Sequence, residues 1–475
     1  MVETSEAIVN TRLAQLKDAQ QSFDKENKFQ SPRIQRAPMF LRQNDKCAKY
    51  FSPKMISFGP IHHGSPSLKQ GERYKLLWTS KFVAEYSEKT NQDKDVAAKL
   101  LLKRIEDNME ELKTLFTEDA IKDYKDKDSD LAWILFVDGC SLLHFLENID
   151  EHRPESLNLK FDQLMYMWRD TALLENQLPR RLLEMLSNKD LEYLMSNCND
   201  MGETKQRGMV TISIQNRKPI HLLDSRRSVF LSTLKEFPTD KYNEMEKEID
   251  TILNQQKNDA DECNIQIDTF SGWHTYKNIR DLKTAGIRVM PMADESDNYA
   301  WRWNNVSFTS KRFSGELRLP VFVFNDVTPY VFWNFIVYEL CPDVGYNYEC
   351  CSFFSFMDSL IDTAEDVKEL RLAGVFQNLL GTDEDLAKLF NELGDDLATK
   401  MYCDKFYTHA VAYSKKYILV KEQIEKHYSN KWKTWLAEFY NTHFNTPWAM
   451  IAFLAALLAL LLTFIQTWFA IYPKN

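Results

Sequence analysis

The stretch that most constrains this chain lies at its C-terminal end, where Trp448 to Tyr472 reads WAMIAFLAALLALLLTFIQTWFAIY. No Asp, Glu, Lys or Arg occurs between Glu438 and Lys474. The hydrocarbon core of a bilayer is about 30 Å thick, and a helix needs about 20 apolar residues to cross it. A buried core helix is the alternative, but core helices this long and this free of charge are unusual. We therefore predict a transmembrane helix over residues 447–472.

Aromatic residues stand at both ends of the predicted transmembrane helix. Trp448 lies at its start, and Trp468 and Tyr472 lie near its end. Trp and Tyr favour the membrane interface because their rings have an apolar body and a polar tip. We therefore predict that these three side chains lie at the two membrane surfaces. Pro447 suits the first position of a helix, since its missing N–H would have no partner there.

The charges that flank the span predict its orientation. Only Lys474 follows it, in a short tail over residues 473–475, whereas six lysines precede it: Lys415, Lys416, Lys421, Lys426, Lys431 and Lys433. Lys and Arg are enriched on the cytoplasmic side of a span. The N-terminal residues lack the apolar stretch of a cleaved signal peptide. We expect a single-pass, tail-anchored protein with the bulk of the chain facing the cytoplasm, and among membranes we favour the plasma membrane.

The composition agrees with a reducing, cytoplasmic location. The chain has a formal net charge of −10 and eight cysteines, none of them in a C-x-x-C spacing. Scattered cysteines without metal-ligand spacing are expected to be reduced and mostly buried. Nucleic-acid-binding proteins present a basic face, so the acidic balance disfavours nucleic acid as a partner. We predict no cofactor, no metal site and no glycan on the sequon at Asn305.

The body is expected to be one large, mainly helical domain. The chain has only 13 glycines and 13% aromatic residues, which suits packed helices better than a glycine-punctuated α/β sheet. We divide it into a polar leader (1–30), either disordered or loosely helical, a helical body (31–404) and an amphipathic juxtamembrane helix (405–446). The juxtamembrane helix would either lie on an anionic membrane surface or pack against the body.

Periodicity and capping signals place elements within the body. We expect helices from about residue 68 and over about 96–117, 130–148, 161–175 and 180–196. Capping boxes at Thr363 and Thr382 predict two further starts, with Gly374 and Gly394 as stops. Residues 306–324 predict a β-hairpin that turns at Ser314–Gly315, with Leu317, Leu319, Val321 and Val323 on one face. The expected fold class is mainly α with a small β-hairpin element and a single C-terminal transmembrane helix.

Two adjacent histidines, His62 and His63, are the first candidate catalytic residues. Neighbouring side chains of a regular strand point to opposite faces, so both could reach one ion only from a turn, which Gly64 permits. No third ligand can be assigned. The structural alternative is a pair of histidines hydrogen-bonded in a packed loop, because buried polar groups are usually paired.

Asp138 is the other candidate, since it lies in the apolar run WILFVDGC. A buried carboxylate without a partner is costly. It is therefore either tied to an Arg or to backbone N–H groups, or it is a functional acid with a shifted pKa. Glu72 and Lys75 have the spacing of an ion pair on one helix face. The polar trio of residues 175–177 is expected to cap helix ends and bridge elements.

Short segments with a recognisable order run along the chain: ISFGPIHHG (56–64), FVDGC (136–140), LENQLP (174–179), DLKTAG (281–286), SLIDTAEDV (359–367), PWA (447–449) and LTFIQT (462–467). Together they resemble the plant family known as domain of unknown function 247, over roughly residues 30–472. Arg180 and Arg181 depart from the apolar residues usual in the family. They either disturb the local packing or create a small charged surface.

The resemblance implies a plant-restricted, mostly helical protein with a C-terminal span and no enzymatic activity established for the family. Some grass members are associated with pollen-side self-incompatibility and others with sex determination, which implies specific protein recognition. The usual signatures of P-loop NTPases, zincins, α/β-hydrolases and kinases are absent from the sequence.

We therefore expect a membrane-anchored recognition or scaffold protein that binds another protein, with a role in reproductive signalling such as self-incompatibility. The alternative is an enzyme of unknown reaction type that uses the His62–His63 loop together with Asp138. The two hypotheses differ in geometry. Convergence of the three side chains on an open pocket would favour catalysis, and separate structural partners for each would favour a scaffold. The sequence does not specify the oligomeric state.

Overall fold

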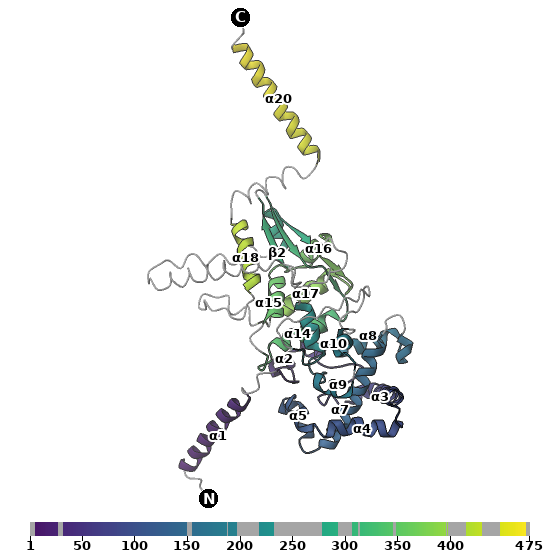
Figure 1. Ribbon diagram of the computed structural model, residues 1–475. Coiled ribbons are helices and arrows are strands. Elements are labelled where there is room, and N and C mark those ends of the chain that lie inside the picture. Colours follow the sequence, from purple (N-terminus) through teal and green to yellow (C-terminus); the bar gives the residue numbers. More distant parts are fainter. Residues whose placement is uncertain are drawn as a thin grey trace. The chain divides into compact units, whose positions relative to one another are not determined.

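The computed structural model is mainly helical (Figure 1). It describes residues 5–26, 32–149, 154–187, 189–196, 218–231, 278–292, 306–311, 314–344, 348–395, 397, 415–429 and 447–471. The chain divides into two compact units: residues 1–233 with 324–353, and residues 234–323 with 354–475. The predicted fold class is confirmed, since the described residues form many helices, a few short strands and a C-terminal apolar helix.

Helix α7 (Asp128–Asn148) is the core of the first unit. It contacts α3 (Lys69–Thr90), α4 (Lys94–Glu106) and α9 (Arg180–Leu186). Most of its side chains are buried, because its sequence is apolar around the whole helix and other helices surround it. Although α7 is long and apolar enough to cross a membrane, this burial identifies it as a core helix.

The first unit contains further helices, and the sequence periodicity did not resolve the breaks between some of them. The expected helix at 96–117 is two, α4 and α5 (Met109–Thr114), and Asn108 between them donates a hydrogen bond to the Arg104 carbonyl. The remaining elements are α1 (Ser5–Glu26), α2 (Met39–Arg42), η1 (Ala48–Tyr50), η2 (Pro66–Leu68), α6 (Glu118–Ile121), η3 (Lys122–Tyr124), η4 (Pro154–Leu157), α8 (Phe161–Asp170), α10 (Leu191–Ser196), α11 (Leu222–Leu231) and α14 (Thr328–Glu339).

The two arginines that depart from the family pattern are accommodated by ion pairs. Arg180 is buried and pairs with Glu184 and Glu192 at 2.9 and 2.8 Å. Arg181 is half exposed and pairs with Glu111 at 2.7 Å. Both side chains therefore replace apolar packing with charge pairs at the start of α9.

A three-stranded sheet lies in the second unit. The predicted hairpin is β2 (Ser307–Ser310) antiparallel to β3 (Gly315–Leu319). Strand β1 (Ile287–Pro291), which the sequence pattern did not predict, pairs in parallel with β3 from Ile287 opposite Gly315 to Pro291 opposite Leu319. Strand order in this sheet is thus β1-β3-β2.

The predicted alternation along 317–323 is wrong after Pro320. Leu317 and Leu319 share a buried face, but from Pro320 onward the buried residues are Pro320, Phe322 and Phe324 rather than Val321 and Val323. Proline donates no ladder hydrogen bond, so β3 ends and the side-chain phase shifts. The next strand, β4 (Phe322–Phe324), pairs with β5 (Phe376–Asn378) in a separate two-stranded sheet.

Capping boxes start two helices of the second unit, as predicted. Thr363 and Asp366 cap α16 (Ala364–Leu372), and Thr382 and Asp385 exchange hydrogen bonds at the start of α17 (Asp383–Asp395). Gly374, with φ of +76°, follows the end of α16 as expected of a stop. Gly394 is not a stop, because it lies inside α17, where a Cβ would collide with the Asp358 carboxylate. The unit also contains α13 (Ile279–Thr284), and α15 (Glu349–Asp358) links the two units along the chain.

Helix α18 (Lys415–Tyr428) is the described part of the expected juxtamembrane helix. Its buried residues, Tyr417, Val420, Ile424 and His427, fall on one face. The helix contacts β2, and His427 Nδ1 lies 2.8 Å from Ser310 Oγ. This part of the helix thus packs against the protein, while residues 405–414 and 430–446 of the predicted juxtamembrane helix lie outside the described residues.

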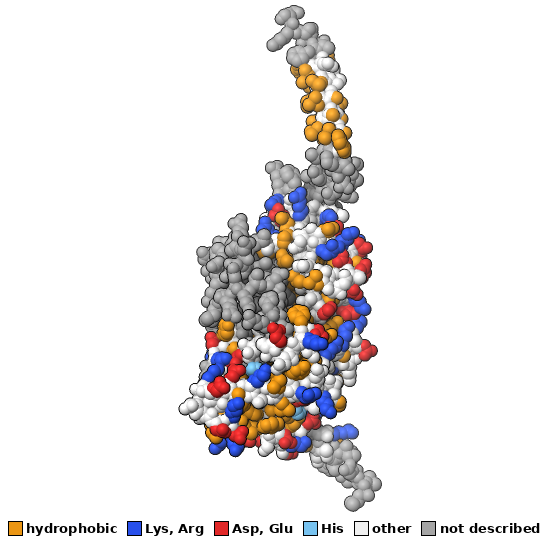
Figure 2. Space-filling model, turned by 90° about the vertical axis from the view of Figure 1, so that its right-hand side faces the viewer, with side chains coloured by type: hydrophobic (Ala, Val, Ile, Leu, Met, Phe, Trp, Pro, Cys, Tyr) orange, Lys and Arg blue, Asp and Glu red, His pale blue; other side chains and the backbone are white. Residues whose placement is uncertain are grey.

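Helix α20 (Pro447–Ile471) is the predicted span. Every described side chain from Ile451 to Trp468 is exposed, and Figure 2 shows hydrophobic side chains along its surface. Of the predicted interface residues, Trp448 and Trp468 lie on this helix and are exposed, and Tyr472 lies outside the described residues. The leader contains helix α1, whose described side chains are exposed as well.

Candidate functional site

An extended segment (residues 53–64) carries both candidate histidines, and buried polar side chains hold it in place. Asp170, the last residue of α8, accepts the backbone N–H groups of Lys54, Met55 and Ile56 at 3.1, 2.6 and 3.0 Å. Its carboxylate also pairs with the Arg169 guanidinium at 2.6 Å. Burial raises the pKa of Asp170, and Arg169 and the backbone donors oppose that rise. One carboxylate thus satisfies three backbone donors that no strand or helix would otherwise pair.

The connecting loop (residues 171–179) joins α8 to α9 and supplies the next contacts. Asn176 accepts the Phe58 N–H at 2.6 Å and donates to the carbonyls of Ile56 and Asp170 at 3.1 and 2.8 Å. Gln177 donates within its own loop and accepts the Leu223 N–H at 3.0 Å. These amides cap and bridge elements, as the sequence predicted.

Gly59 shows why the segment can approach this loop so closely. Its φ is +76°, and a Cβ would lie 2.9 Å from the Gln177 carbonyl oxygen. An L-residue would be strained at this φ and would also press against that carbonyl. Glycine is therefore the residue that lets the segment and the loop touch at this point.

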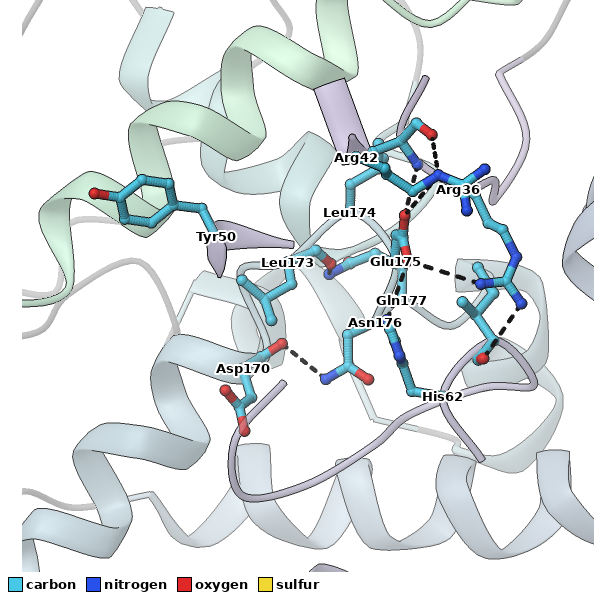
Figure 3. Close-up of polar contacts among 12 residues, drawn as sticks. Arg36, Arg42, Tyr50, His62, Asp170, Leu173, Leu174, Glu175, Asn176 and Gln177 are labelled. Atoms are coloured by element: carbon cyan, nitrogen blue, oxygen red, sulfur yellow. Dashed lines mark hydrogen bonds and ion pairs between the residues drawn. The ribbon is translucent and has the colours of Figure 1, made fainter. Parts of the chain in front are cut away.

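Glu175, the first residue of the polar trio, is a buried carboxylate surrounded by basic groups (Figure 3). One oxygen accepts the Ala37 N–H at 2.9 Å, and the other lies 3.1 Å from His62 Nε2. Arg36 and Arg42 point toward the same carboxylate at 4.0 and 3.9 Å. Glu175, His62, Arg36 and Arg42 form what we call the Glu175 cluster, which is partly open to solvent at His62 and both arginines. Arg36 also pairs with Asp119 at 3.2 Å.

Asp138 belongs to a different group, the Lys75 cluster, which consists of Lys75, Asp138, Glu72, Ser57 and Gly59. The Lys75 ammonium is fully buried and lies 2.7 Å from Asp138 and 2.8 Å from Glu72. Its third neighbour is Ser57 Oγ at 3.4 Å, and the Gly59 N–H donates to Asp138 at 2.8 Å. The predicted Glu72–Lys75 pair is confirmed, and Asp138 is tied to a Lys and a backbone N–H rather than to an Arg.

The electrostatics of the Lys75 cluster follow from one cation facing two carboxylates. Burial alone would lower the pKa of Lys75, but Asp138 and Glu72 outweigh it and raise that pKa above its usual value. Burial raises the pKa of Asp138, and Lys75 opposes the rise. Lys75 therefore stays charged, and removing it would leave buried negative charge without a partner.

The structure places the candidate residues in separate surroundings. His62 contacts Glu175. Asp138 instead contacts Lys75, and it also contacts Gly59, which lies on the same extended segment as His62. His63 is partly buried, and within the described residues its Nδ1 has no hydrogen-bond partner. No group of three His, Cys, Asp or Glu side chains suited to a metal ion occurs among the described residues.

A further buried charge pair of the first unit, Arg227 and Glu339, was not predicted from the sequence. Arg227 donates to Glu339 at 2.6 and 2.9 Å, and the same carboxylate accepts the N–H groups of Cys350 and Cys351 at 2.8 and 2.9 Å. Burial raises the pKa of both thiols, so they are protonated and unreactive. Like these two, the other described cysteines are free and buried, as expected. A charged residue inside an apolar run, such as Glu339 in VFWNFIVYEL, is the signal that could have found this pair.

Comparison with known proteins identifies relatives in plants. The family DUF247, described as "Plant protein of unknown function", matches residues 34–462. The UPF0481 protein At3g47200 of Arabidopsis thaliana is 24% identical over 434 residues, which cover 89% of this chain and 83% of the relative. The putative UPF0481 protein At3g02645 of the same plant is 22% identical, with 89% of this chain and 88% of the relative covered. No solved structure matches the chain.

Proposed function

The chain belongs to the plant protein family DUF247, and we propose that this member is a tail-anchored, single-pass membrane protein whose cytoplasmic body recognises another protein. Within that role it acts as a recognition or scaffold protein in reproductive signalling, of which self-incompatibility is one example. The membrane that we favour is the plasma membrane.

The observation that carries the proposal is the exposure of α20. Each described side chain from Ile451 to Trp468 is exposed, and no charged residue interrupts the helix. A water-exposed apolar helix of this length is unfavourable, whereas a bilayer would cover it. The other helix of the described residues that is long and apolar enough to cross a membrane, α7, is already covered by protein, so α20 is the one that supports membrane anchoring.

The buried polar groups of the first unit support recognition over catalysis. Asp138, Asp170, Glu175 and Glu339 each accept hydrogen bonds from backbone N–H groups and lie near basic side chains. Structural contacts of this kind account for each buried carboxylate without a reaction. The buried charged residues of the first unit therefore hold its loops in place.

Exposed aromatic side chains on the first unit offer contacts for a protein partner. Phe40 on α2, Trp133 on α7 and Phe161 on α8 are 62%, 51% and 55% exposed. Single exposed apolar residues are common, but aromatic side chains are also the ones that most often dominate binding energy at interfaces. We therefore select Trp133, the one that projects from the core helix, for the test of partner binding.

The test is affinity purification of the full-length chain from native plant membranes, followed by mass spectrometry. We expect a defined partner that copurifies with the wild-type chain. Trp133→Ala is the surface variant, and Trp78→Ala, at a fully buried position, reports what general unfolding does to the capture. Recovery of no specific partner from the tissue that expresses the protein would contradict the recognition proposal.

The alternative, an enzyme, is favoured by one observation. His62 Nε2 lies 3.1 Å from Glu175, although not in hydrogen-bond geometry, and a carboxylate beside an imidazole is found at many general bases. However, the same carboxylate also accepts the Ala37 N–H and faces two arginines. Loss of a bound ion or of a measured turnover in a well-folded His62→Gln variant would favour this alternative.

A further inference from the structure

Helix α20 sorts its residues by size around its axis. Successive residues of an α-helix are rotated by about 100°, so each position has a defined direction. Between Ile451 and Trp468, every small or polar residue falls within one sector of about 120°: Ala452, Ala455, Ala456, Ala459, Thr463, Gln466 and Thr467. Every Leu, Ile, Phe and Trp of that range falls outside the sector. We call this sector the small-residue face.

The polar side chains on the small-residue face differ in their hydrogen bonds. Thr463 donates to the Ala459 carbonyl and Thr467 to the Thr463 carbonyl, each at 2.8 Å, so both hydroxyl donors are satisfied within the helix. Among the residues that the structure describes, Gln466 is exposed and has no hydrogen-bond partner. A glutamine amide brings two N–H donors and an acceptor oxygen.

The depth of Gln466 in a bilayer determines how costly its amide group would be. Gln466 lies seven residues from Ala459, the midpoint of α20, or about 10 Å along the axis. The hydrocarbon half-thickness is about 15 Å, so an inserted α20 would place Gln466 in hydrocarbon, where lipid provides no hydrogen-bond partner. An amide at that depth is costly unless another polypeptide supplies a partner.

We propose that α20 pairs in parallel with α20 of a second copy of this chain through the small-residue face, with the two Gln466 amides hydrogen-bonded to each other. The inference rests on the proposed membrane anchoring. Two copies inserted in the same orientation place Gln466 at the same depth, and a glutamine amide is complementary to itself because it both donates and accepts. Alanines spaced by four residues, such as Ala452 and Ala456, let two helices approach closely enough for that contact.

A two-fold parallel pair also explains why the large side chains are kept on the other side. Leu454, Leu458 and Leu461 would face lipid chains, which are as apolar as they are and provide no drive toward helix association. The contact between helices must therefore come from close packing and from the amide pair, and both lie on the small-residue face. Each copy would then present its own body at the membrane surface, so that a partner meets two bodies.

The experiment uses the full chain reconstituted into phosphatidylcholine liposomes. Donor-labelled and acceptor-labelled chains are mixed, and energy transfer is followed while added lipid dilutes the protein. Gln466→Leu removes the amide, and Ala459→Leu adds bulk to the small-residue face. Leu461→Phe adds bulk at a similar depth on the opposite face and is the matched control.

We expect wild-type transfer above the level of random proximity. Gln466→Leu should require about three- to tenfold more protein per lipid for half-maximal transfer, as expected for loss of interhelical hydrogen bonds. Ala459→Leu should also weaken transfer, and Leu461→Phe should not. Random-level transfer for the wild type, or equal transfer for all three variants, would overturn the pairing. A chain that alkaline carbonate extracts from the liposomes would overturn the anchor as well, so the two failures are distinguishable.

Discussion

Lys75 is the residue whose chemistry most clearly connects sequence to packing in this protein. Its ammonium is fully buried and is shared between Asp138 on α7 and Glu72 on its own helix. The desolvation of a buried charge is expensive, so Lys75 and Asp138 are stable in the interior only while each keeps its partner. Ser57 and Gly59 join the same cluster, which links the extended segment to the core helix.

Lys75→Met should therefore destabilise the protein strongly. Breaking a buried pair by removing one partner costs about 3–5 kcal/mol, because the other partner keeps an unpaired charge. Chemical denaturation of the full chain in detergent measures this loss. The double variant Lys75→Met/Asp138→Leu should recover part of it, and Glu72→Gln, at a partly exposed position, should cost less. A Lys75→Met variant as stable as the wild type would contradict the cluster's role.

Substitutions of His62 and of His63 should lower the melting temperature by different amounts. Replacing both His62 and His63 with Gln should lower the melting temperature, with a loss of about 1–3 kcal/mol for imperfectly paired polar groups. His62→Gln should account for most of this loss, because His62 contacts Glu175. Metal content, measured by elemental analysis, should not change. Loss of stoichiometric metal from a variant that melts normally would instead point to the enzyme.

His144 predicts a dependence of stability on pH. Burial, with help from Lys81 and Lys189, lowers its pKa from 6.5 to about 4. The unfolded chain thus binds a proton below pH 6.5 that the folded chain resists, so stability falls between pH 6.5 and pH 4. Carboxylates titrate in the same pH range, and the His144→Gln variant separates their contribution from that of His144. The difference in unfolding free energy between wild type and His144→Gln should shrink as the pH falls, and a constant difference would exclude this origin.

At the scale of elements, Gly394 shows a helix position where only glycine fits. It lies in the last turn of α17, and any Cβ would meet the Asp358 carboxylate. Gly394→Ala should therefore destabilise the second unit by about 1–3 kcal/mol, as overpacking does elsewhere. The melting temperature reports the change. In Gly394→Ala/Asp358→Ala the obstacle is gone, so the two substitutions should cost less together than the sum of their separate effects.

The α20 helix makes a separate prediction. Deletion of residues 447–471 should release the body from membranes, because α7, the other sufficiently long and apolar helix in the part of the chain that the structure describes, is buried in the first unit. Alkaline carbonate extraction followed by sedimentation measures the release. The full-length chain, treated in parallel, should stay in the pellet. A deletion variant that also stays there would reveal a second membrane-binding element.

Local signals in the sequence predicted the elements better than the contacts among them. The apolar runs gave α3, α7 and α20, and the capping box at Thr363 gave the start of α16. Gly394 was misread because a glycine needed for close approach looks the same in sequence as a glycine that ends a helix. Strand β1 was missed because five residues carry too little alternation to separate them from a loop.

The candidate sites were predictable only in part, because their partners are distant in sequence. The sequence indicated that Asp138 needs a partner and that Glu72 and Lys75 pair, but not that one Lys serves both carboxylates. His62 and Glu175 are in contact although they belong to two separate family segments, residues 56–64 and 174–179. Tertiary packing decides such contacts, and no spacing rule within one helix or strand encodes them.

In the proposed function, the whole molecule combines a body whose buried charged residues hold its loops in place with a helix that crosses the membrane. Lysines precede α20, and the chain carries a sequon at Asn305, within the body. If the body faces the cytoplasm, it is open to added protease and Asn305 never meets the glycosylation machinery. Orientation is thus the property on which access to a cytoplasmic partner depends.

Protease protection of the full-length chain in sealed microsomes measures that orientation most directly. The body should be digested, a small fragment that contains α20 should survive in the membrane, and Asn305 should carry no glycan. Detergent should then expose nothing further of the body. A body that resists protease until detergent is added, or a glycan on Asn305, would contradict the cytoplasmic, membrane-anchored arrangement.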